Sequence, residues 1–218
     1  MTARPQETKR PPPRLVLITP VIEAAEAILP DLQAALAVAD VAAVLLRLSD
    51  ADERTLISRV KALAPMVQDS GAAFLLVDRP ELVVPASADG AHLTGIEAFN
   101  AAVPTLKPER IAGAGNLVTR HDAMLAAEAG ADYVMFGELN AAGHRPSFEA
   151  IIERVEWWAE VFQAPCVGFA QTLEEIAPLV TAGADFIALG DFVFADPRGP
   201  SATLAAAAAR LKLAEPVQ

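Results

Sequence analysis

The chain contains the same nine-residue pattern twice, at residues 130–138 and 183–191. Each copy has Gly-Ala-Asp, a short apolar run, a closing glycine and an acidic residue, and a weaker echo lies at residues 88–94. An apolar run of about five residues between turn residues indicates a strand buried on both faces, as in parallel sheets that helices cover. Every copy follows a segment with helical spacing, so the repeating unit of helix, turn and buried strand predicts a βα barrel.

Eight segments in total have the strand pattern, and segments with helical spacing separate most of them. The predicted strands are residues 15–19, 43–48, 73–77, 90–94, 110–115, 133–137, 165–170 and 186–193. The predicted helices are residues 23–39, 52–69, 96–106, 119–129, 147–162, 172–181 and 201–213, with a short segment around 81–84. Eight units joined by short loops favour a (β/α)8 TIM barrel over a doubly wound sheet, which would need fewer units and a glycine-rich first turn.

Polar residues and a proline predict where several of these elements begin or end. Asp50 or Asp52 is suited to cap the second helix. Thr119, with Asp122 three residues later, is close to a capping box for a later helix. We expect Pro20 to end the first strand, because proline cannot donate to a strand ladder.

Composition limits the class of protein. The 218 residues suit one domain, and we expect a disordered lead-in over residues 1–14 and a single barrel over residues 15–218. A formal net charge of −11 argues against a nucleic-acid partner, whose phosphates need a basic stripe, but not against a small phosphorylated substrate. The sequence shows neither a signal-peptide pattern nor a membrane-spanning run, so we expect a cytoplasmic protein. The single cysteine, Cys166, is expected to pack in the core.

In a TIM barrel the carboxyl ends of the strands carry the active site, and the amino ends serve stability. Asp89, Asp132 and Asp185 precede their strands, so we expect turn or capping roles for them at the stability face. The polar residues that end or follow a strand should line the opposite end, the mouth of the barrel. They are Arg47, Asp78, Thr94, Glu97, Asn116, Glu138, Asn140, His144, Arg145, Gln171, Asp191 and Arg198.

Asp78 and Glu97 are the pair at the mouth that suits a divalent metal. Mg²⁺ is commonly held by one or two carboxylates together with substrate phosphates. Alternatively, Asp78 caps the segment that starts at Pro80, and Glu97 favours the dipole of its helix from the first turn. Arg47 and Arg145 can bind phosphate through paired donors, or an arginine there can be a structural partner of Asp78.

His92 lies within the fourth predicted strand, where it could be a hydrogen-bonded core residue or a catalyst. His121 and His144 are expected on a helix and a loop respectively. The adjacent Trp157 and Trp158 cannot both face the core from one helix. One of them could mark a contact in a homodimer or lie partly covered at the surface.

Several stretches of the sequence resemble one family, in the same order along the chain. They are Leu15-Val16-Leu17-Ile18-Thr19, Val44-Leu45-Leu46-Arg47, Val77-Asp78-Arg79, Asp89-Gly90-Ala91-His92-Leu93, residues 130–137 and residues 183–194. Together they resemble thiamine phosphate synthase and its thiazole tautomerase relative. The resemblance implies a Mg²⁺-assisted coupling in which a hydroxymethylpyrimidine diphosphate loses pyrophosphate and the nitrogen of a thiazole phosphate takes the resulting cation.

The resemblance also implies roles for particular residues. Asp78 matches a metal-binding aspartate, and Glu97 falls where the family has its second one. Arg47 matches the arginine of the second strand, and Arg145 falls near a lysine that binds the diphosphate. The implied catalytic residues are Arg47, Asp78 and Arg145, the metal ligands are Asp78 and Glu97, and the substrate-binding residues are Arg47, His92, Asn116, Arg145, Gln171, Gly190 and Asp191.

The chain departs from the family at several positions around the mouth. Asp191 stands where the family has a small residue, usually serine, and its carboxylate would repel a phosphate dianion unless it is neutralised. The other departures are Leu45 for glutamine, Ser49 for lysine, Val77 for asparagine, Gly115-Asn116-Leu117 for a region with serine and histidine, and Ala170-Gln171 for paired glycines.

Two other functions stay open on the sequence. One is isomerisation of a thiazole or another small heterocycle, with His92, His121 or Glu138 as a proton carrier. The other is a non-catalytic binding or regulatory barrel for an uncharged or cationic ligand, which Leu45 and Asp191 favour and which would not need Mg²⁺.

Overall fold

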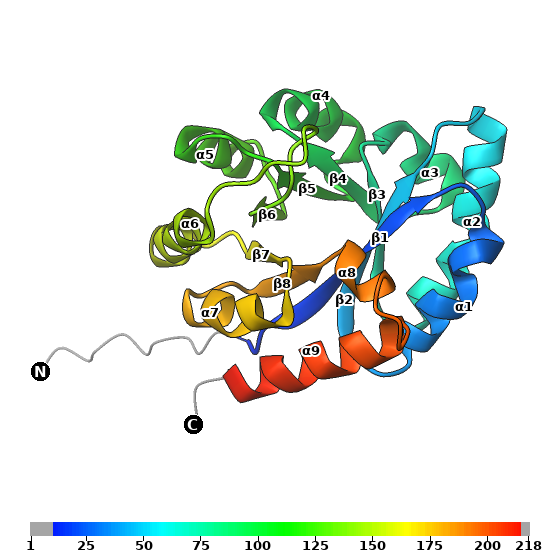
Figure 1. Cartoon of the computed structure of the whole chain (residues 1–218). Helices are drawn as coiled ribbons and strands as arrows, with labels where there is room; N and C mark the ends of the chain where they lie inside the picture. Colours follow the sequence, from blue (N-terminus) through cyan, green and yellow to red (C-terminus); the bar gives the residue numbers. More distant parts are fainter. Residues whose placement is uncertain (1–10, 215–218) are drawn as a thin grey trace, which may run out of the picture.

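Eight parallel strands close into one barrel in the computed structural model, which describes residues 11–214 (Figure 1). Each strand pairs with its neighbours in sequence, and β8 pairs with β1 to complete the ring. The predicted (β/α)8 TIM barrel is confirmed. Residues 1–10 and 215–218 lie outside the described residues, and most of the predicted disordered lead-in falls there.

Helices alternate with the strands and surround them. The strands are β1 Arg14–Ile22, β2 Val41–Leu48, β3 Ala73–Val77, β4 Gly90–Thr94, β5 Ile111–Gly115, β6 Tyr133–Phe136, β7 Cys166–Ala170 and β8 Phe186–Leu189. The α-helices are α1 Ala25–Leu36, α2 Glu53–Asp69, α3 Val83–Ala86, α4 Ile96–Leu106, α5 Arg120–Glu128, α6 Phe148–Val161, α7 Ile176–Thr181, α8 Asp191–Phe194 and α9 Pro200–Ala214. Two 3-10 helices are η1 Pro80–Leu82 and η2 Leu173–Glu175.

The strands that differ most in length from the prediction are β1 and β8. β1 continues past Pro20, so the expectation that this proline ends the strand is wrong. The register between β1 and β2 shifts between Ile18 and Val21, and such an irregularity accommodates a residue that has no N–H for the ladder. β8 ends at Leu189, and the segment predicted as its end forms the short helix α8, which begins at Asp191.

The predicted helix starts are confirmed where a polar side chain caps the helix. The Asp52 carboxylate accepts a hydrogen bond of 3.0 Å from the Thr55 N–H at the start of α2. At the start of α5, Thr119 accepts from the Asp122 N–H, and Asp122 accepts from the Thr119 N–H. These bonds satisfy backbone donors that have no partner inside the helix.

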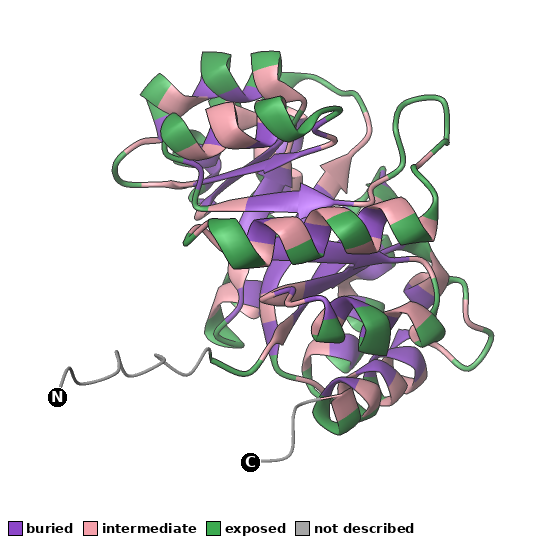
Figure 2. Ribbon diagram, turned by 90° about the vertical axis from the view of Figure 1, so that its left-hand side faces the viewer, coloured by how far each residue is buried: buried purple, intermediate pink, exposed green. Residues whose placement is uncertain are grey.

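Apolar side chains of the strands alternate between two cores. Leu15 and Leu17 point outward and pack in the layer between the sheet and the helices, whereas Val16 and Ile18 point into the barrel. Figure 2 shows that the strands are largely buried and that the exposed residues lie on the outer faces of the helices and in the loops. Cys166 is buried in the outer layer, as expected for a core cysteine.

Trp157 and Trp158 have different surroundings on α6. Trp158 is buried, and its indole N–H donates to the Ala164 carbonyl at 2.7 Å. Trp157 is half-buried, and the guanidinium carbon of Arg120 lies 4.9 Å from the centre of its ring. The prediction that the two side chains cannot both face the core is confirmed.

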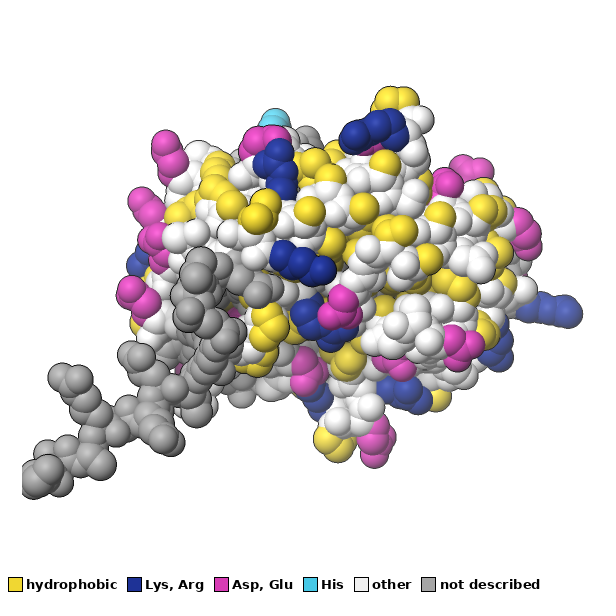
Figure 3. Space-filling view, turned by 90° about the horizontal axis from the view of Figure 1, so that it is seen from below, with side chains coloured by type: hydrophobic (Ala, Val, Ile, Leu, Met, Phe, Trp, Pro, Cys, Tyr) yellow, Lys and Arg dark blue, Asp and Glu magenta, His cyan; other side chains and the backbone are white. Residues whose placement is uncertain are grey.

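The outer surface mixes charge and apolar area. On the face shown in Figure 3, acidic and basic side chains are interspersed with small apolar areas. Among the described residues, no helix has both the length and the apolar character that a membrane span requires.

Three aspartates join neighbouring strands at the amino end of the barrel. Asp89, directly before β4, accepts a hydrogen bond of 2.7 Å from the Phe74 N–H of β3 and donates its own N–H to the Phe74 carbonyl at 2.9 Å. The same pair of bonds joins Asp132 to Ala112 of β5, and Asp185 to Cys166 of β7. The predicted location at the amino end is confirmed, but the carboxylates bind neighbouring strands where turn or capping roles were expected. These bonds explain why the Gly-Ala-Asp pattern recurs.

We expect Asp89→Ala to lower the free energy of unfolding by about 1–3 kcal/mol, because it leaves the buried N–H of Phe74 without this acceptor. Urea denaturation would measure the change. Asp31→Ala, at an exposed position on α1, is the matched control and should change the free energy by less than about 0.5 kcal/mol. Equal effects of the two changes would contradict a stabilising role for Asp89.

Candidate active site

A cavity of about 140 Å³, which we name the central cavity, opens among the carboxyl ends of the strands. This is the end of a TIM barrel where active sites lie. Its apolar lining includes Ile18, Leu45, Val77 and Phe169, and its polar lining is Arg47, His92, Thr94, Glu138 and Asp191. Arg47, His92, Asp191 and Gly190, which also lines the cavity, were predicted from the sequence to bind substrate.

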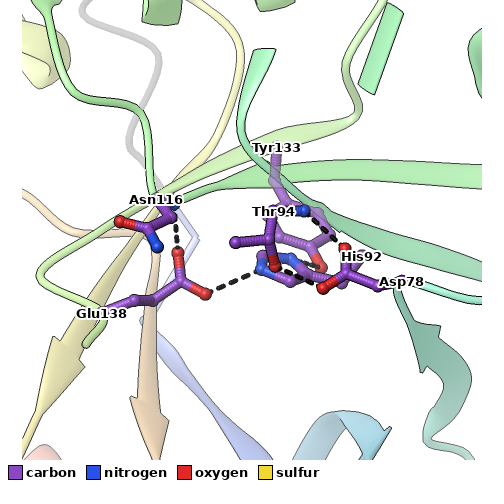
Figure 4. A network of polar contacts seen from close by, with 6 residues as sticks. All are labelled: Asp78, His92, Thr94, Asn116, Tyr133 and Glu138. Atoms are coloured by element: carbon purple, nitrogen blue, oxygen red, sulfur yellow. Dashed lines mark hydrogen bonds and ion pairs between the residues drawn. The ribbon is translucent and has the colours of Figure 1, made fainter. Parts of the chain in front are cut away.

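A chain of hydrogen bonds crosses one wall of the central cavity (Figure 4). His92 of β4 is 1% exposed, and its Nδ1 lies 2.9 Å from the Tyr133 hydroxyl. Its Nε2 lies 2.8 Å from Oε1 of Glu138, and Oε2 of Glu138 accepts from the Asn116 N–H at 2.7 Å. His92 is therefore a hydrogen-bonded core residue that also lines the cavity, and a catalytic role for it stays a prediction.

The phenol of Tyr133 ends this chain of hydrogen bonds. Burial, followed by the negative charges of Glu138 and Asp132, raises the pKa of Tyr133 well above its usual range. The phenol therefore stays protonated, so it can donate to Nδ1 of His92. When it does so, the neutral tautomer of His92 carries its proton on Nε2 and donates to the Glu138 carboxylate.

Two glycines of β5 make room for this chain. A Cβ at Gly113 would overlap the ring of Tyr133, and a Cβ at Gly115 would overlap Oε2 of Glu138 and lie 2.5 Å from Nε2 of His92. Any side chain at either position would displace the groups that the chain joins. Neither Tyr133 nor the need for these glycines was recognised from the sequence, although the Gly-x-Gly spacing on β5 was visible.

Asp78 lies at the rim of the mouth in a left-handed backbone conformation, with φ of 53°. Its two carboxylate oxygens accept from the N–H and the hydroxyl of Thr94, both at 2.7 Å. The alternative that Asp78 caps the segment at Pro80 is wrong, because η1 has no side-chain cap. Aspartate tolerates this backbone region better than most residues, and strained conformations concentrate at functional sites.

Two carboxylates follow neighbouring strands near this rim, Asp78 after β3 and Glu97 after β4. Asp78 supplies oxygen donors that Thr94 holds in place, and Glu97 is an exposed residue in the first turn of α4. The described residues contain no group of three acidic, histidine or cysteine side chains that could hold a metal ion by themselves. A cation there would need oxygens from a substrate as well, which matches the preference of Mg²⁺ for one or two carboxylates together with phosphates.

Arg47 reaches across the mouth to Asp191. Its Nε donates to the Thr19 carbonyl at 2.5 Å, and its Nη2 forms an ion pair with Asp191 at the start of α8. This arginine is therefore the partner of Asp191 and not of Asp78. The pair also neutralises the carboxylate that would otherwise repel a phosphate group.

Arg145 lies outside the central cavity. Its guanidinium forms two hydrogen bonds with the Glu175 carboxylate, and both side chains are largely buried. Glu175 also accepts from the Gln171 N–H at 2.8 Å. Arg145 lines a second cavity of about 340 Å³ with Asn116 and the exposed His144, and Glu138 lines both cavities.

The chain contains one tyrosine, so its phenolate absorbance reports on Tyr133 alone. We expect the folded protein to show no phenolate until well above pH 10, whereas the urea-unfolded chain should titrate near the ordinary value of about 10. Because the pKa is higher in the folded state, stability is complete below the unfolded-state pKa of about 10 and declines as the pH rises from there toward the folded-state pKa. A folded-state titration that matches the unfolded one would contradict the buried donor role of Tyr133.

Comparison with known proteins agrees with this architecture. A family model described as thiamine monophosphate synthase matches residues 15–192. A thiamine-phosphate synthase of Rhodospirillum centenum is 40% identical over 200 residues, which cover 88% of this chain and 94% of that protein. A thiamine-phosphate synthase of Hyphomonas neptunium is 37% identical over 213 residues, covering 94% of this chain and 95% of that protein.

Solved structures share the fold at lower identity. A thiamine phosphate pyrophosphorylase from Pyrococcus furiosus superposes with a TM-score of 0.76 at 21% identity, covering 93% of this chain and 97% of that one. A 3-hexulose-6-phosphate synthase from Salmonella typhimurium gives 0.68 at 11% identity, covering 92% and 100%. The solved structures support the fold. The family model and the two relatives show to which family the chain belongs. The chain belongs to the thiamine monophosphate synthase family.

Proposed function

We propose that this protein joins a hydroxymethylpyrimidine diphosphate to a thiazole phosphate and releases pyrophosphate, as a step in thiamine biosynthesis. The observation that carries the proposal is the 40% identity to a thiamine-phosphate synthase across 94% of that protein. The position of Arg47, His92 and Asp78 at the carboxyl end of a closed barrel is in keeping with it. A cytoplasmic location, a homodimer and the absence of a nucleic-acid partner stay predictions from the sequence.

The proposed reaction breaks one bond and forms one. The C–O bond between the pyrimidine methylene and the diphosphate breaks, and its electron pair leaves with pyrophosphate. The lone pair of the thiazole nitrogen then forms the new C–N bond to the cationic methylene. Because no proton needs to move, the protein has to bind both substrates, orient them, exclude water and balance charge.

Two sets of residues would bind the diphosphate. Asp78 and Glu97 would hold Mg²⁺, which offsets the negative charge of the leaving pyrophosphate when it is bound. Arg47 is fixed by Thr19 and Asp191 through Nε and Nη2, so the remaining N–H groups of its guanidinium can donate to phosphate oxygens.

The apolar lining of the central cavity would protect the reactive cation. Ile18, Leu45 and Phe169 line the cavity beside its polar groups. Water that reached the cation would give the alcohol in place of the coupled product, so a wall without donors or acceptors favours coupling. Leu45 then contributes to this wall at a position where the resemblance implies a glutamine.

A second candidate function is a ligand-binding barrel without synthase activity. Two ion pairs favour it, because Arg47 is engaged by Asp191 and Arg145 by Glu175. In that case the arginines serve the structure, and the cavity takes an uncharged or cationic ligand without Mg²⁺. Turnover of the two substrates by the purified protein distinguishes the candidates.

We expect Asp78→Asn to lower kcat by about 100-fold or more, because it removes one of two predicted metal carboxylates. In thermal denaturation, Mg²⁺ with pyrophosphate should raise the midpoint of the wild-type protein but not that of the variant, since a ligand of the folded state stabilises it by mass action. Asp31→Asn on α1 is the matched control and should behave as wild type. Unchanged turnover in Asp78→Asn would contradict the assignment of Asp78 as a metal ligand.

A further inference from the structure

The Glu138 carboxylate lines the central cavity, and among the described residues no arginine or lysine forms an ion pair with it. We propose that Glu138 is a catalytic residue whose fixed charge stabilises the cation formed when pyrophosphate leaves the pyrimidine. The resemblance to the family assigns no role to this position. The inference rests on the proposed function and names the group that stabilises the positive charge.

The charges around the cavity support this assignment. Arg47 is the one arginine or lysine among the described residues that line the cavity, and Asp191 already pairs with it. His92 contacts Glu138 through Nε2, and Asn116 contributes only a backbone N–H. No arginine or lysine of the described lining therefore competes with a ligand for the Glu138 carboxylate.

Two hydrogen bonds hold Glu138 in place, and its carboxylate can still bind a ligand. Each carboxylate oxygen accepts one hydrogen bond, from His92 or from Asn116, and each has further lone-pair capacity. The side chain is 14% exposed and lines the central cavity. A carboxylate held in this way need not move as positive charge develops on the substrate.

The place of this carboxylate depends on Gly115. A Cβ at residue 115 would overlap Oε2 of Glu138, so a side chain there and the carboxylate exclude each other. The region of the family that carries a serine and a histidine reads Gly115-Asn116-Leu117 in this chain. In this chain the absence of a side chain at residue 115 therefore makes room for the Glu138 carboxylate in the cavity wall.

The chemistry of the coupling requires such a group. When the C–O bond breaks, positive charge develops on the methylene and the pyrimidine ring, and the C–N bond then passes it to the thiazole ring. The apolar walls of Ile18, Leu45 and Phe169 lower the local dielectric, so a carboxylate in the same cavity interacts more strongly with a cation than it would in water. Glu138 faces positive charge both during the reaction and in the product.

Glu138→Gln keeps the size of the side chain and removes its charge. In the steady-state synthase assay with Mg²⁺ we expect kcat to fall about 100-fold while both KM values change little, because the lost interaction forms only as charge develops. Glu160→Gln, an exposed position near the carboxyl end of α6, is the matched control and should keep wild-type kinetics. Urea denaturation of each variant would report any loss of folding.

A binding measurement tests the charge without turnover. Thiamine carries a permanent positive charge and no phosphate, and its affinity can be measured by titration calorimetry without Mg²⁺. We expect Glu138→Gln to weaken thiamine binding by about tenfold or more. An uncharged analogue with thiophene in place of the thiazolium ring should bind both proteins equally.

The outcomes separate this inference from the proposed function. If the wild-type protein lacks turnover but binds thiamine in a manner that depends on Glu138, the synthase proposal fails and the cation site stands. If the wild-type protein turns over and Glu138→Gln matches it, the inference is overturned and the synthase proposal stands. Equal thiamine affinities, or no binding by the wild-type protein at millimolar thiamine, also overturn the inference, whatever happens to kcat.

Discussion

The closure of the barrel between β8 and β1 is the constraint on which every other feature of the structure depends. Asp185 lies at this seam, where its N–H and carboxylate bind Cys166 of β7 and its carbonyl accepts from the Arg14 N–H of β1. Asp89 and Asp132 make corresponding contacts at other strand pairs, and Asp40, before β2, binds the Arg14 guanidinium. The amino end of the barrel therefore carries the bonds that set strand register, and the carboxyl end is left for chemistry.

The carboxyl end balances charge within a small volume. Arg47 pairs with Asp191, Arg145 pairs with Glu175, and His92 holds Glu138 through a hydrogen bond. The neutralised Asp191 no longer prevents a phosphate from binding nearby, whereas Glu138 has no arginine or lysine partner among the described residues. One site can therefore hold an anionic leaving group at its rim and a cation in its interior, which is the distribution of charge that a diphosphate coupling creates.

Much of the fold follows from local signals in the sequence. The sequence predicted the eight strands and the capping roles of Asp52 and Thr119. It also placed the Gly-Ala-Asp aspartates at the amino end of the barrel. These features were predictable because hydrophobic periodicity and turn chemistry act over a few residues. The continuation of β1 through Pro20 was not predictable, because the partner strands decide whether a missing donor is tolerated. Tyr133 was also missed, since its hydroxyl acquires its role only beside His92.

The sequence by itself determined the type of fold, the family and the set of polar residues that reach the mouth of the barrel. Only the tertiary structure decided which of these residues meet. Arg47 pairs with a residue 144 positions away, His92 with one 46 positions away and Arg145 with one 30 positions away. Hydrophobic periodicity acts locally and specifies where strands form, whereas these pairings depend on the closed ring that brings distant strand ends to one cavity.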